Sequence, residues 1–210
     1  MNNRLRIALT KGRLQDKSVE LFERAGLDCA PIHDPGRRLV HSLPNYPMDA
    51  VLSKAPDVIT YVEHGICDLG IVGKDTIMEQ GGSFFEVLDL NFGKCRFALA
   101  VKDGSDFYGT YQNRVVASKY PNVTKTYFTE KGMDVSVIKI EGSVELAPLV
   151  GLANGIVDIV QTGTTLKENG LTPIETVAPV SARLIANTAS MKLYHTEIFD
   201  LMDRIEAVKA

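Results

Sequence analysis

Residues 65–73 read Gly-Ile-Cys-Asp-Leu-Gly-Ile-Val-Gly, and residues 155–163 read Gly-Ile-Val-Asp-Ile-Val-Gln-Thr-Gly. Gly, Ile, Asp and the terminal Gly recur at the same offsets, 90 positions apart. Each stretch follows an amphipathic helical pattern, so each predicts a helix ended by glycine, a strand, and a glycine before the next helix. The repeat predicts two lobes built alike, with equivalent loops on either side of a ligand cleft. The alternative is that unrelated helix–strand connections share a glycine cap and an apolar strand.

Short apolar runs alternate with helical patterns along the rest of the chain, which is typical of βαβ units on mainly parallel sheets. We therefore predict an α/β fold of two similar lobes around a central cleft. Lobe I would comprise residues 1–91 and 177–210, and lobe II residues 92–176. The chain would then cross a hinge twice, as it does in two-lobed proteins that close on a small molecule. A turn is predicted at Asp34, Pro35 and Gly36.

Composition and charge exclude several classes of protein. The 210 residues are 45% hydrophobic and 23% charged, which is typical of a globular protein rather than a disordered or fibrous one. Lys and Arg number 23 against 26 Asp and Glu, so the net charge is -3 and no overall basic field favours nucleic acid. No apolar run is long enough for a membrane span or a signal peptide, so we expect a cytoplasmic protein with no membrane association.

The cysteines and histidines show no metal-binding pattern. The three cysteines have no CxxC spacing, and the four histidines are scattered without a metal-ligand spacing. We therefore predict reduced, mostly buried thiols and no metal-ligating residues. The chain also has no GxGxxG motif for dinucleotides, no complete Walker A motif for nucleoside triphosphates and no GxSxG motif of hydrolases.

A loop of small, hydroxyl-bearing residues follows Asp158 and its apolar neighbours: Thr162, Gly163, Thr164 and Thr165. Such a loop leaves backbone N–H groups pointing outward at a helix N-terminus, where the helix dipole also favours negative charge. The threonine hydroxyls add further donors. The loop therefore predicts a phosphate-binding site. The alternative is that Thr162 or Thr164 simply caps the helix and Gly163 completes a turn.

Cations follow the first predicted strand, which ends at Thr10. Lys11 supplies a point charge, Gly12 lets a ligand approach the backbone, and Arg13 supplies a forked donor. An open α/β sheet binds its ligands at this end of a strand, so the triplet predicts an anion site. The alternative is that these are solvated loop charges. Arg37 and Arg38 could likewise reach the site, from this chain or from a neighbouring subunit, or could be plain surface charges.

Carboxylates could bind sugar hydroxyls near the same loops. Glu141, with Gly142 and Ser143, stands at the end of a predicted strand, and Glu145 follows on a helix. Glutamate is also common at helix starts because of the helix dipole, which is the alternative explanation.

Five stretches together resemble a known family: residues 8–14 (ALTKGRL), 61–65 (YVEHG), 68–75 (DLGIVGKD), 141–148 (EGSVELAP) and 158–166 (DIVQTGTTL). They resemble the ATP phosphoribosyltransferases, which open histidine biosynthesis, and they keep the family's order over nearly the whole chain. Members of the long form carry an additional C-terminal domain, and by its length of 210 residues this chain resembles the short, catalytic-only form. That form works with a regulatory subunit similar to histidyl-tRNA synthetase.

The resemblance implies a fold, a reaction and a set of partners. The fold would be a phosphoribosyltransferase similar to the periplasmic binding proteins. ATP and phosphoribosyl pyrophosphate (PRPP) would give N1-(5-phosphoribosyl)-ATP and pyrophosphate. Mg²⁺ would travel with PRPP and pyrophosphate, without a dedicated protein site. The chain would act as a homodimer within a hetero-oligomer.

Roles for individual residues follow from the same resemblance. Arg13 would stabilise the leaving pyrophosphate, and Arg37 would act as a second clamp. The loop at residues 162–165 would hold the 5-phosphate of PRPP, and Asp158 or Glu141 would lie near the ribose hydroxyls. The alternatives are a non-catalytic two-lobed module that binds small anions, and a phosphoribosyltransferase that acts on another base.

Overall fold

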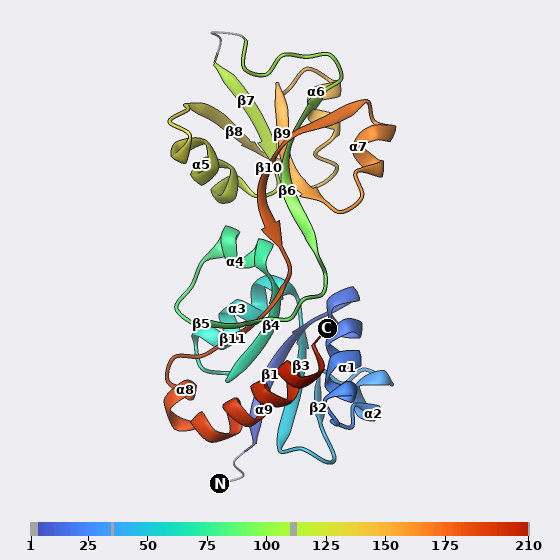
Figure 1. Cartoon of the computed structure of the whole chain (residues 1–210), viewed down its shortest axis with the longest axis vertical. Coiled ribbons are helices and arrows are strands. Elements are labelled where there is room, and N and C mark those ends of the chain that lie inside the picture. Colours follow the sequence, from blue (N-terminus) through green and yellow to red (C-terminus); the bar gives the residue numbers. More distant parts are fainter. Residues whose placement is uncertain (1–3, 35, 110–112, 210) are drawn as a thin grey trace. The chain divides into compact units, whose positions relative to one another are not determined.

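The computed structural model describes residues 4–34, 36–109 and 113–209 (Figure 1). The chain divides into unit 1, made of Met1–Gly93 and Ser181–Ala210, and unit 2, made of Lys94–Val180. It therefore passes between the units twice, at 93/94 and 180/181, where the sequence predicted 91/92 and 176/177. None of the helices in the described part of the chain has the length and apolarity to cross a lipid bilayer.

Unit 1 contains a six-stranded sheet in the order β2-β3-β1-β4-β11-β5. Its strands are β1 (Leu5–Thr10), β2 (Val40–Ser42), β3 (Met48–Ser53), β4 (Leu69–Gly73), β5 (Phe85–Asp89) and β11 (Ala182–Ala186). Its helices are α1 (Arg13–Arg24), α2 (Ala30–His33), α3 (Ala55–Glu63), α4 (Lys74–Gln80), α8 (Ser190–Leu193) and α9 (His195–Val208). Strands β3, β1 and β4 run parallel, whereas β2, β11 and β5 pair antiparallel with their neighbours.

Unit 2 contains a five-stranded sheet in the order β10-β6-β9-β7-β8. Its strands are β6 (Cys95–Lys102), β7 (Arg114–Ser118), β8 (Val135–Lys139), β9 (Gly155–Val160) and β10 (Leu171–Val180). Its helices are α5 (Pro121–Glu130), α6 (Leu146–Leu149) and α7 (Thr164–Glu168). Strands β9, β7 and β8 run parallel, and β6 and β10 are antiparallel.

The two sheets share one topology. The parallel trio β3-β1-β4 of unit 1 corresponds to β8-β7-β9 of unit 2, and the antiparallel pair β11-β5 corresponds to β6-β10. The predicted class, two similar α/β lobes, is confirmed. The sheets are mixed rather than mainly parallel, because each trio is extended by two antiparallel strands.

The sequence repeat aligns the helix starts but not the strands. Gly73 and Gly163 both precede the first residue of a helix, as predicted. Gly65, however, has a positive φ of 69° after α3, whereas Gly155 is the first residue of β9. The positive-φ glycine after α6 is Gly151, so the predicted cap at Gly155 is wrong. Strand β4 leads directly into its helix, whereas residues 161–163 intervene after β9.

Several local predictions also differ from the structure. The helix on which Glu145 was predicted to lie is the short α6, and Glu145 directly precedes its first residue. Strand β10 was not predicted, because Pro173 and Pro179 lie within it; it forms an edge of its sheet and carries two register shifts, where proline is tolerated. The turn predicted at Asp34–Gly36 includes Pro35, which lies outside the described residues.

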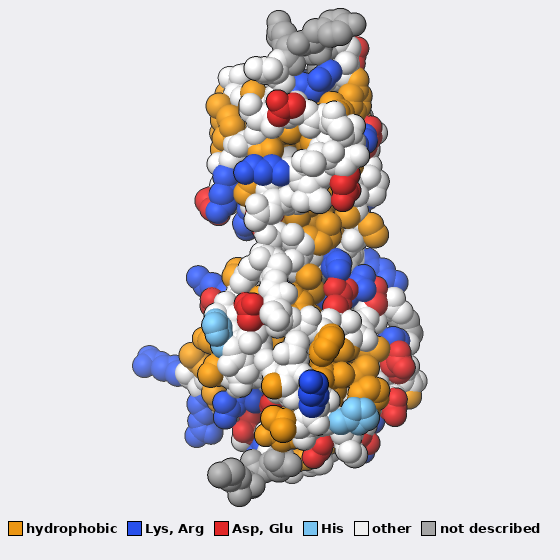
Figure 2. Space-filling model, turned by 90° about the vertical axis from the view of Figure 1, so that its left-hand side faces the viewer, with side chains coloured by type: hydrophobic (Ala, Val, Ile, Leu, Met, Phe, Trp, Pro, Cys, Tyr) orange, Lys and Arg blue, Asp and Glu red, His pale blue; other side chains and the backbone are white. Residues whose placement is uncertain are grey.

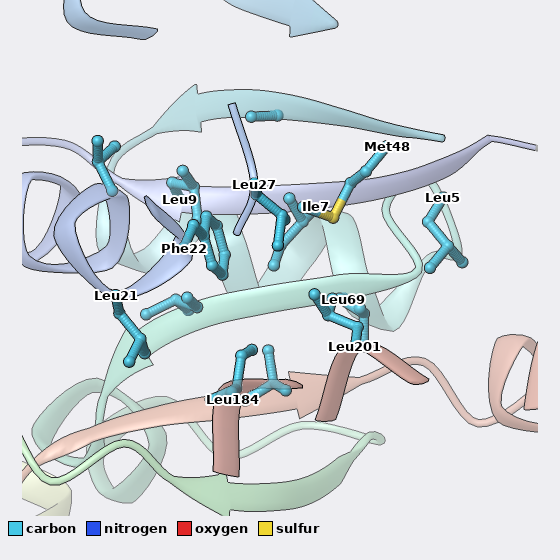
Figure 3. Close-up of a cluster of buried hydrophobic side chains, with 14 of the residues drawn as sticks. Leu5, Ile7, Leu9, Leu21, Phe22, Leu27, Met48, Leu69, Leu184 and Leu201 are labelled. Carbon is cyan, nitrogen blue, oxygen red and sulfur yellow. The ribbon is translucent and has the colours of Figure 1, made fainter. Parts of the chain in front are cut away.

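The core of unit 1 is formed by one face of its sheet and the helices that cover it (Figure 3). Leu5, Ile7 and Leu9 alternate along β1 and point to this face, where Phe22 of α1 and Leu201 of α9 cover them. All five side chains are almost completely buried. In unit 2, one cluster of buried residues is rich in alanine, and Phe97, Phe107 and Phe128 are buried in the same unit. Each sheet is therefore a rigid base for the loops at its edges.

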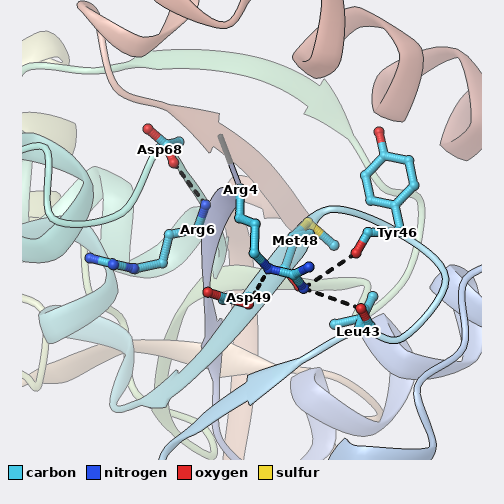
Figure 4. Close-up of polar contacts among 7 residues, drawn as sticks. All are labelled: Arg4, Arg6, Leu43, Tyr46, Met48, Asp49 and Asp68. Atoms are coloured by element: carbon cyan, nitrogen blue, oxygen red, sulfur yellow. Dashed lines mark hydrogen bonds and ion pairs between the residues drawn. The ribbon is translucent and has the colours of Figure 1, made fainter. Parts of the chain in front are cut away.

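Polar contacts fix the amino-terminal end of β1 (Figure 4). Arg4 Nε pairs with a carboxylate oxygen of Asp49 at 2.8 Å, and Arg4 Nη2 donates to the Met48 carbonyl oxygen at 2.8 Å. The backbone N–H of Arg6 donates to Asp68 Oδ2 at 2.7 Å. These charges therefore stabilise the fold at the edge of the sheet opposite to the one where parallel strands present ligand-binding loops.

Candidate functional site

The carboxyl edge of the unit 2 sheet gathers three polar loops. Because β7, β8 and β9 are parallel, the segments after Ser118, Lys139 and Val160 leave the sheet at one edge. The predicted residues of unit 2 all lie on this edge or next to it: Glu141, Asp158, Thr162, Gly163, Thr164 and Thr165. Open α/β sheets bind ligands at this edge, so the placement fits a binding site.

The loop after β9 turns on one glycine. Gly163 has φ 81° and ψ 2°, a left-handed conformation that glycine adopts without strain, and it precedes the first residue of α7. The Oγ1 atoms of Thr162 and Thr164 lie 3.1 Å apart, and Thr162 Oγ1 accepts a hydrogen bond from the Thr164 backbone N–H, the first of α7, at 3.4 Å. Thr162, Thr164 and Thr165 are exposed. The loop therefore presents hydroxyls and first-turn N–H groups, which have no acceptor within a helix.

Asp158 lies on β9 as a partly buried carboxylate. Burial raises its pKa, the nearby Glu145 carboxylate raises it further, and Lys119 and a hydrogen bond from the Ile159 backbone oppose the shift. Glu145 directly precedes α6. Two carboxyl groups therefore lie close together beside the loop. The sequence predicted Glu145 as a possible ligand for sugar hydroxyls. It did not predict the electrostatic interaction of Glu145 with Asp158, because that interaction depends on the fold.

Glu141 differs from Asp158 in its exposure to solvent. Its side chain is 72% exposed and forms an ion pair with Lys139 at 2.7 Å. That contact lowers the pKa of Glu141. The carboxylate is thus ionised and open to solvent, whereas Asp158 is partly desolvated.

The carboxyl edge of unit 1 carries a lysine after each parallel strand. Strands β1, β3 and β4 end at Thr10, Ser53 and Gly73, and the next residues are Lys11, Lys54 and Lys74. Of these three lysines, only Lys11 was predicted to be a site residue, although all three lie between a strand and a helix. Lys74 is held by Glu86, with Nζ and Oε2 2.5 Å apart. Lys11 and Lys54 are exposed.

Lys11, Gly12 and Arg13 connect β1 to α1. The Lys11 backbone N–H donates to the Ser53 carbonyl oxygen at 2.9 Å, which fixes the start of the segment on the sheet. Gly12 has φ 90° and directly precedes α1, and Arg13 is the first residue of that helix. All three are exposed. The helix N-terminus and both cations favour an anion here.

Arg37 and Arg38 lead into β2. The Leu52 backbone N–H donates to the Leu39 carbonyl oxygen at 2.9 Å, so this segment lies beside the end of β3, at the carboxyl edge of unit 1. Both arginines are exposed and line a hollow of about 480 Å³ together with His41 and its neighbours. On the face drawn in Figure 2, acidic and basic side chains are scattered among hydrophobic and other side chains.

The cysteines offer no activated nucleophile at these edges. Burial raises the pKa of Cys29 to about 12 and that of Cys67 to about 11, so both thiols are protonated at neutral pH. Within residues 4–34, 36–109 and 113–209, no group of three His, Cys, Asp or Glu side chains is arranged to hold a metal ion.

Two alike α/β units, joined by two crossings and carrying polar loops at their carboxyl edges, define a two-lobed binding fold. Solved structures of low sequence identity share it. The periplasmic aliphatic sulphonate binding protein SsuA from Escherichia coli has a TM-score of 0.61 at 12% identity, covering 99% of this chain and 72% of that one. The VFT2 domain of Bordetella pertussis BvgS has a TM-score of 0.59 at 11% identity, covering 98% and 88%. These similarities show the fold alone.

Closer relatives are enzymes. The family model HisG, ATP phosphoribosyltransferase, matches residues 54–207. Curated ATP phosphoribosyltransferases from Clostridium kluyveri and Clostridium acetobutylicum are 53% and 55% identical, over 97% and 98% of this chain and 93% and 95% of theirs. The HisG:HisZ complex from Thermotoga maritima contains a chain with a TM-score of 0.83 at 29% identity, covering 97% of both chains. This chain belongs to the ATP phosphoribosyltransferase family.

Proposed function

We propose that this chain transfers the 5-phosphoribosyl group of PRPP to N1 of ATP, releasing pyrophosphate and forming N1-(5-phosphoribosyl)-ATP, the first step of histidine biosynthesis. The observation that carries this proposal is the identity of 53% and 55% with enzymes of that name over nearly the whole chain. The polar loops at both carboxyl edges support it, because both substrates are polyanions.

The reaction needs charge stabilisation more than a strong base. Adenine N1 already has a lone pair, whereas the departing pyrophosphate gains negative charge as the anomeric carbon becomes positive. We assign Arg13 and Arg37 to that leaving group as catalytic residues, since preorganised cations stabilise developing charge. Lys11 and the backbone at Gly12 would bind the same anionic groups. The position of Arg13 at the N-terminus of α1 supports its role, because the helix dipole adds to the positive potential.

We assign the PRPP ribose and its 5-phosphate to unit 2. Thr162, Gly163, Thr164 and Thr165 would hold the phosphate with hydroxyls and backbone N–H groups. Asp158, and Glu141 beyond it, would accept hydrogen bonds from the ribose hydroxyls. Asp158 is the better supported of the two, because it is partly buried beside the loop.

Mg²⁺ would enter with the substrate. Diphosphate oxygens are the hard ligands that Mg²⁺ prefers, and it commonly keeps water molecules and binds through substrate phosphates. Bound in this way, it would neutralise part of the charge on the leaving pyrophosphate. We assign it no dedicated protein ligands.

A second subunit completes the proposal. The Thermotoga maritima structure is described as a HisG:HisZ complex. We propose that this chain likewise works as a homodimer within a hetero-oligomer, with a regulatory subunit similar to histidyl-tRNA synthetase, in the cytoplasm.

Turnover tests the function directly. The purified chain, mixed with ATP, PRPP and Mg²⁺, is expected to release pyrophosphate and to form a nucleotide with the mass of phosphoribosyl-ATP. Other purine and pyrimidine bases and nucleotides in place of ATP should give at most weak turnover. Tight binding of PRPP without pyrophosphate release, with and without the second subunit, would favour the non-catalytic binding module. Faster turnover with another base would favour a different phosphoribosyltransferase.

A further inference from the structure

Arg96 on β6 is a cation that the proposed function has not used. Its Nε atom is buried and has no hydrogen-bond partner in the described part of the protein. Arg183 has a similar unpartnered Nε, but its Nη atoms form ion pairs with Glu86 and Asp89 at 3.2 and 2.9 Å. No such ion pair of Arg96 is found among the described residues, although its side chain is only partly exposed. Arg183 thus has a structural role, whereas the charge of Arg96 is uncompensated.

The register of unit 2 places Arg96 beside the phosphate loop. Arg96 pairs with Val160 on the neighbouring strand β9, and Ala98 pairs with Asp158. Residues in register share a face of the sheet, and alternate residues along a strand return to that face. Arg96 and Asp158 are therefore diagonal neighbours on one face. Val160 is also the last residue of β9, so Arg96 lies at the strand end from which the loop departs.

Two opposite charges on one face remain without ion-pair partners. Among the described residues, Asp158 accepts a hydrogen bond from the Ile159 backbone and forms no ion pair. Partly desolvated charges without partners are unfavourable, and a ligand with complementary groups relieves that cost. A phosphorylated sugar offers both complements, since its hydroxyls donate to a carboxylate and its phosphate accepts from a guanidinium.

We propose that Arg96 is a further substrate-binding residue, which donates to the 5-phosphate of PRPP while Asp158 accepts from the ribose hydroxyls. This inference rests on the proposed function and adds a side-chain cation to a phosphate site otherwise made of hydroxyls and backbone. The 5-phosphate is favoured over the pyrophosphate because Arg96 adjoins the loop assigned to the 5-phosphate.

The test measures binding of ribose 5-phosphate and of pyrophosphate separately, by calorimetry on the full chain. Arg96→Gln should weaken ribose 5-phosphate binding and raise the PRPP KM by about 10- to 100-fold, the usual loss for a charge-assisted hydrogen bond. Pyrophosphate binding should change less than threefold. Arg96→Lys keeps the charge but not the fork, so it should lose roughly 3- to 10-fold.

Lys102→Gln is the matched control. It removes one positive charge from the opposite end of the same strand, where Lys102 lines a hollow with Phe107 and Asn154. This variant should bind both ligands as the wild type does. The melting temperature of each variant shows that it folds, and Arg96→Gln should not lower it, because the replaced charge has no ion-pair partner to lose.

The outcomes separate this inference from the proposed function. If wild-type protein binds PRPP and Arg96→Gln binds ribose 5-phosphate equally well, Arg96 is not a ligand. If Arg96→Gln weakens only pyrophosphate binding, the 5-phosphate assignment is wrong. If Lys102→Gln weakens ribose 5-phosphate as much as Arg96→Gln does, the effect is one of net charge. A folded wild type that binds neither PRPP nor ATP would refute the proposed function itself.

Discussion

Replacing Gly163 by alanine isolates the contribution of the loop backbone. The residue has φ 81°, and a Cβ built there would meet only Val160 Cγ1, at 3.8 Å. The added methyl group therefore meets no steric clash. The substitution destabilises the folded state because alanine must adopt the left-handed conformation, which costs about 1–2 kcal/mol for an L-residue. Alanine also lowers the conformational entropy of the unfolded chain, which offsets part of this cost, so the expected net loss of stability is about 1 kcal/mol. For a chain of this length, that corresponds to a decrease in melting temperature of about 2–4 °C.

Gly151 provides a matched control in the same unit. It has φ 78°, and a Cβ there would meet nothing within 4 Å, so Gly151→Ala carries the same conformational cost. It follows α6 and precedes β9, at the edge of the sheet opposite to the phosphate loop. The two variants should therefore lose equal stability.

Their PRPP kinetics should differ. If Gly163→Ala moves the loop out of its left-handed turn, one or two charge-assisted hydrogen bonds to the 5-phosphate are lost, at about 1.5–3 kcal/mol each. The PRPP KM should then rise at least roughly 10-fold, measured by pyrophosphate release, while the Gly151→Ala variant keeps the wild-type value. Gly163→Asn should be intermediate, because asparagine tolerates this conformation. Equal PRPP KM values for the two alanine variants, with equal losses of melting temperature, would refute the role of the loop.

Three further predictions concern charge and regulation. Arg13→Ala should lower kcat by about 10²- to 10³-fold with a smaller change in PRPP affinity. Arg13→Lys should recover only part of that loss. If Arg13→Ala raises KM and leaves kcat unchanged, Arg13 only binds the substrate in its ground state. Because burial raises the pKa of Asp158, its contribution to stability is present at low pH and lost as pH rises through that raised value. Asp158→Asn should therefore raise the melting temperature at about pH 7 and give no gain near the usual carboxyl pKa of about 4. The same variant should weaken PRPP binding. A lower melting temperature at neutral pH would contradict this prediction. The isolated chain should be insensitive to histidine and become sensitive when the regulatory subunit is added, which titration of activity with and without that subunit checks; equally potent inhibition of the lone chain would place the inhibitor site here.

The elements that the sequence predicted correctly have strong local signals. Strand β1 is a short, mainly apolar run that is buried at every position except Arg6, and it ends before Lys11-Gly12-Arg13. Gly163 stands where a helix begins, so local sequence patterns located both features. Strand β10 was missed because its prolines argue against a strand, and only the antiparallel pairing with β6 compensates for them.

Other features depend on contacts between distant residues. The position of Arg96 beside the phosphate loop follows from the register of β6 against β9, and nothing near residue 96 in the sequence encodes it. The proximity of Glu145 to Asp158 likewise follows from the way α6 and β9 come together. By contrast, Lys54 and Lys74 could have been selected with Lys11, because each lies between an apolar strand-like run and a helical pattern in the sequence.

Strand β11 imposes an order on biosynthesis. It lies between β4 and β5 in the unit 1 sheet, although residues 94–180 separate it in sequence from both. While a ribosome makes that segment, which takes roughly 5 to 20 s at bacterial or eukaryotic speeds, β5 has no sheet partner and the surface under α9 is uncovered. Unit 2 is contiguous, so it can complete its own sheet before the first-made half of the protein is finished. The nascent N-terminal segment is then the part that exposes unpaired strand edges. A stop codon before residue 182 would remove β11 and leave β4 and β5 without the strand that joins them in the sheet.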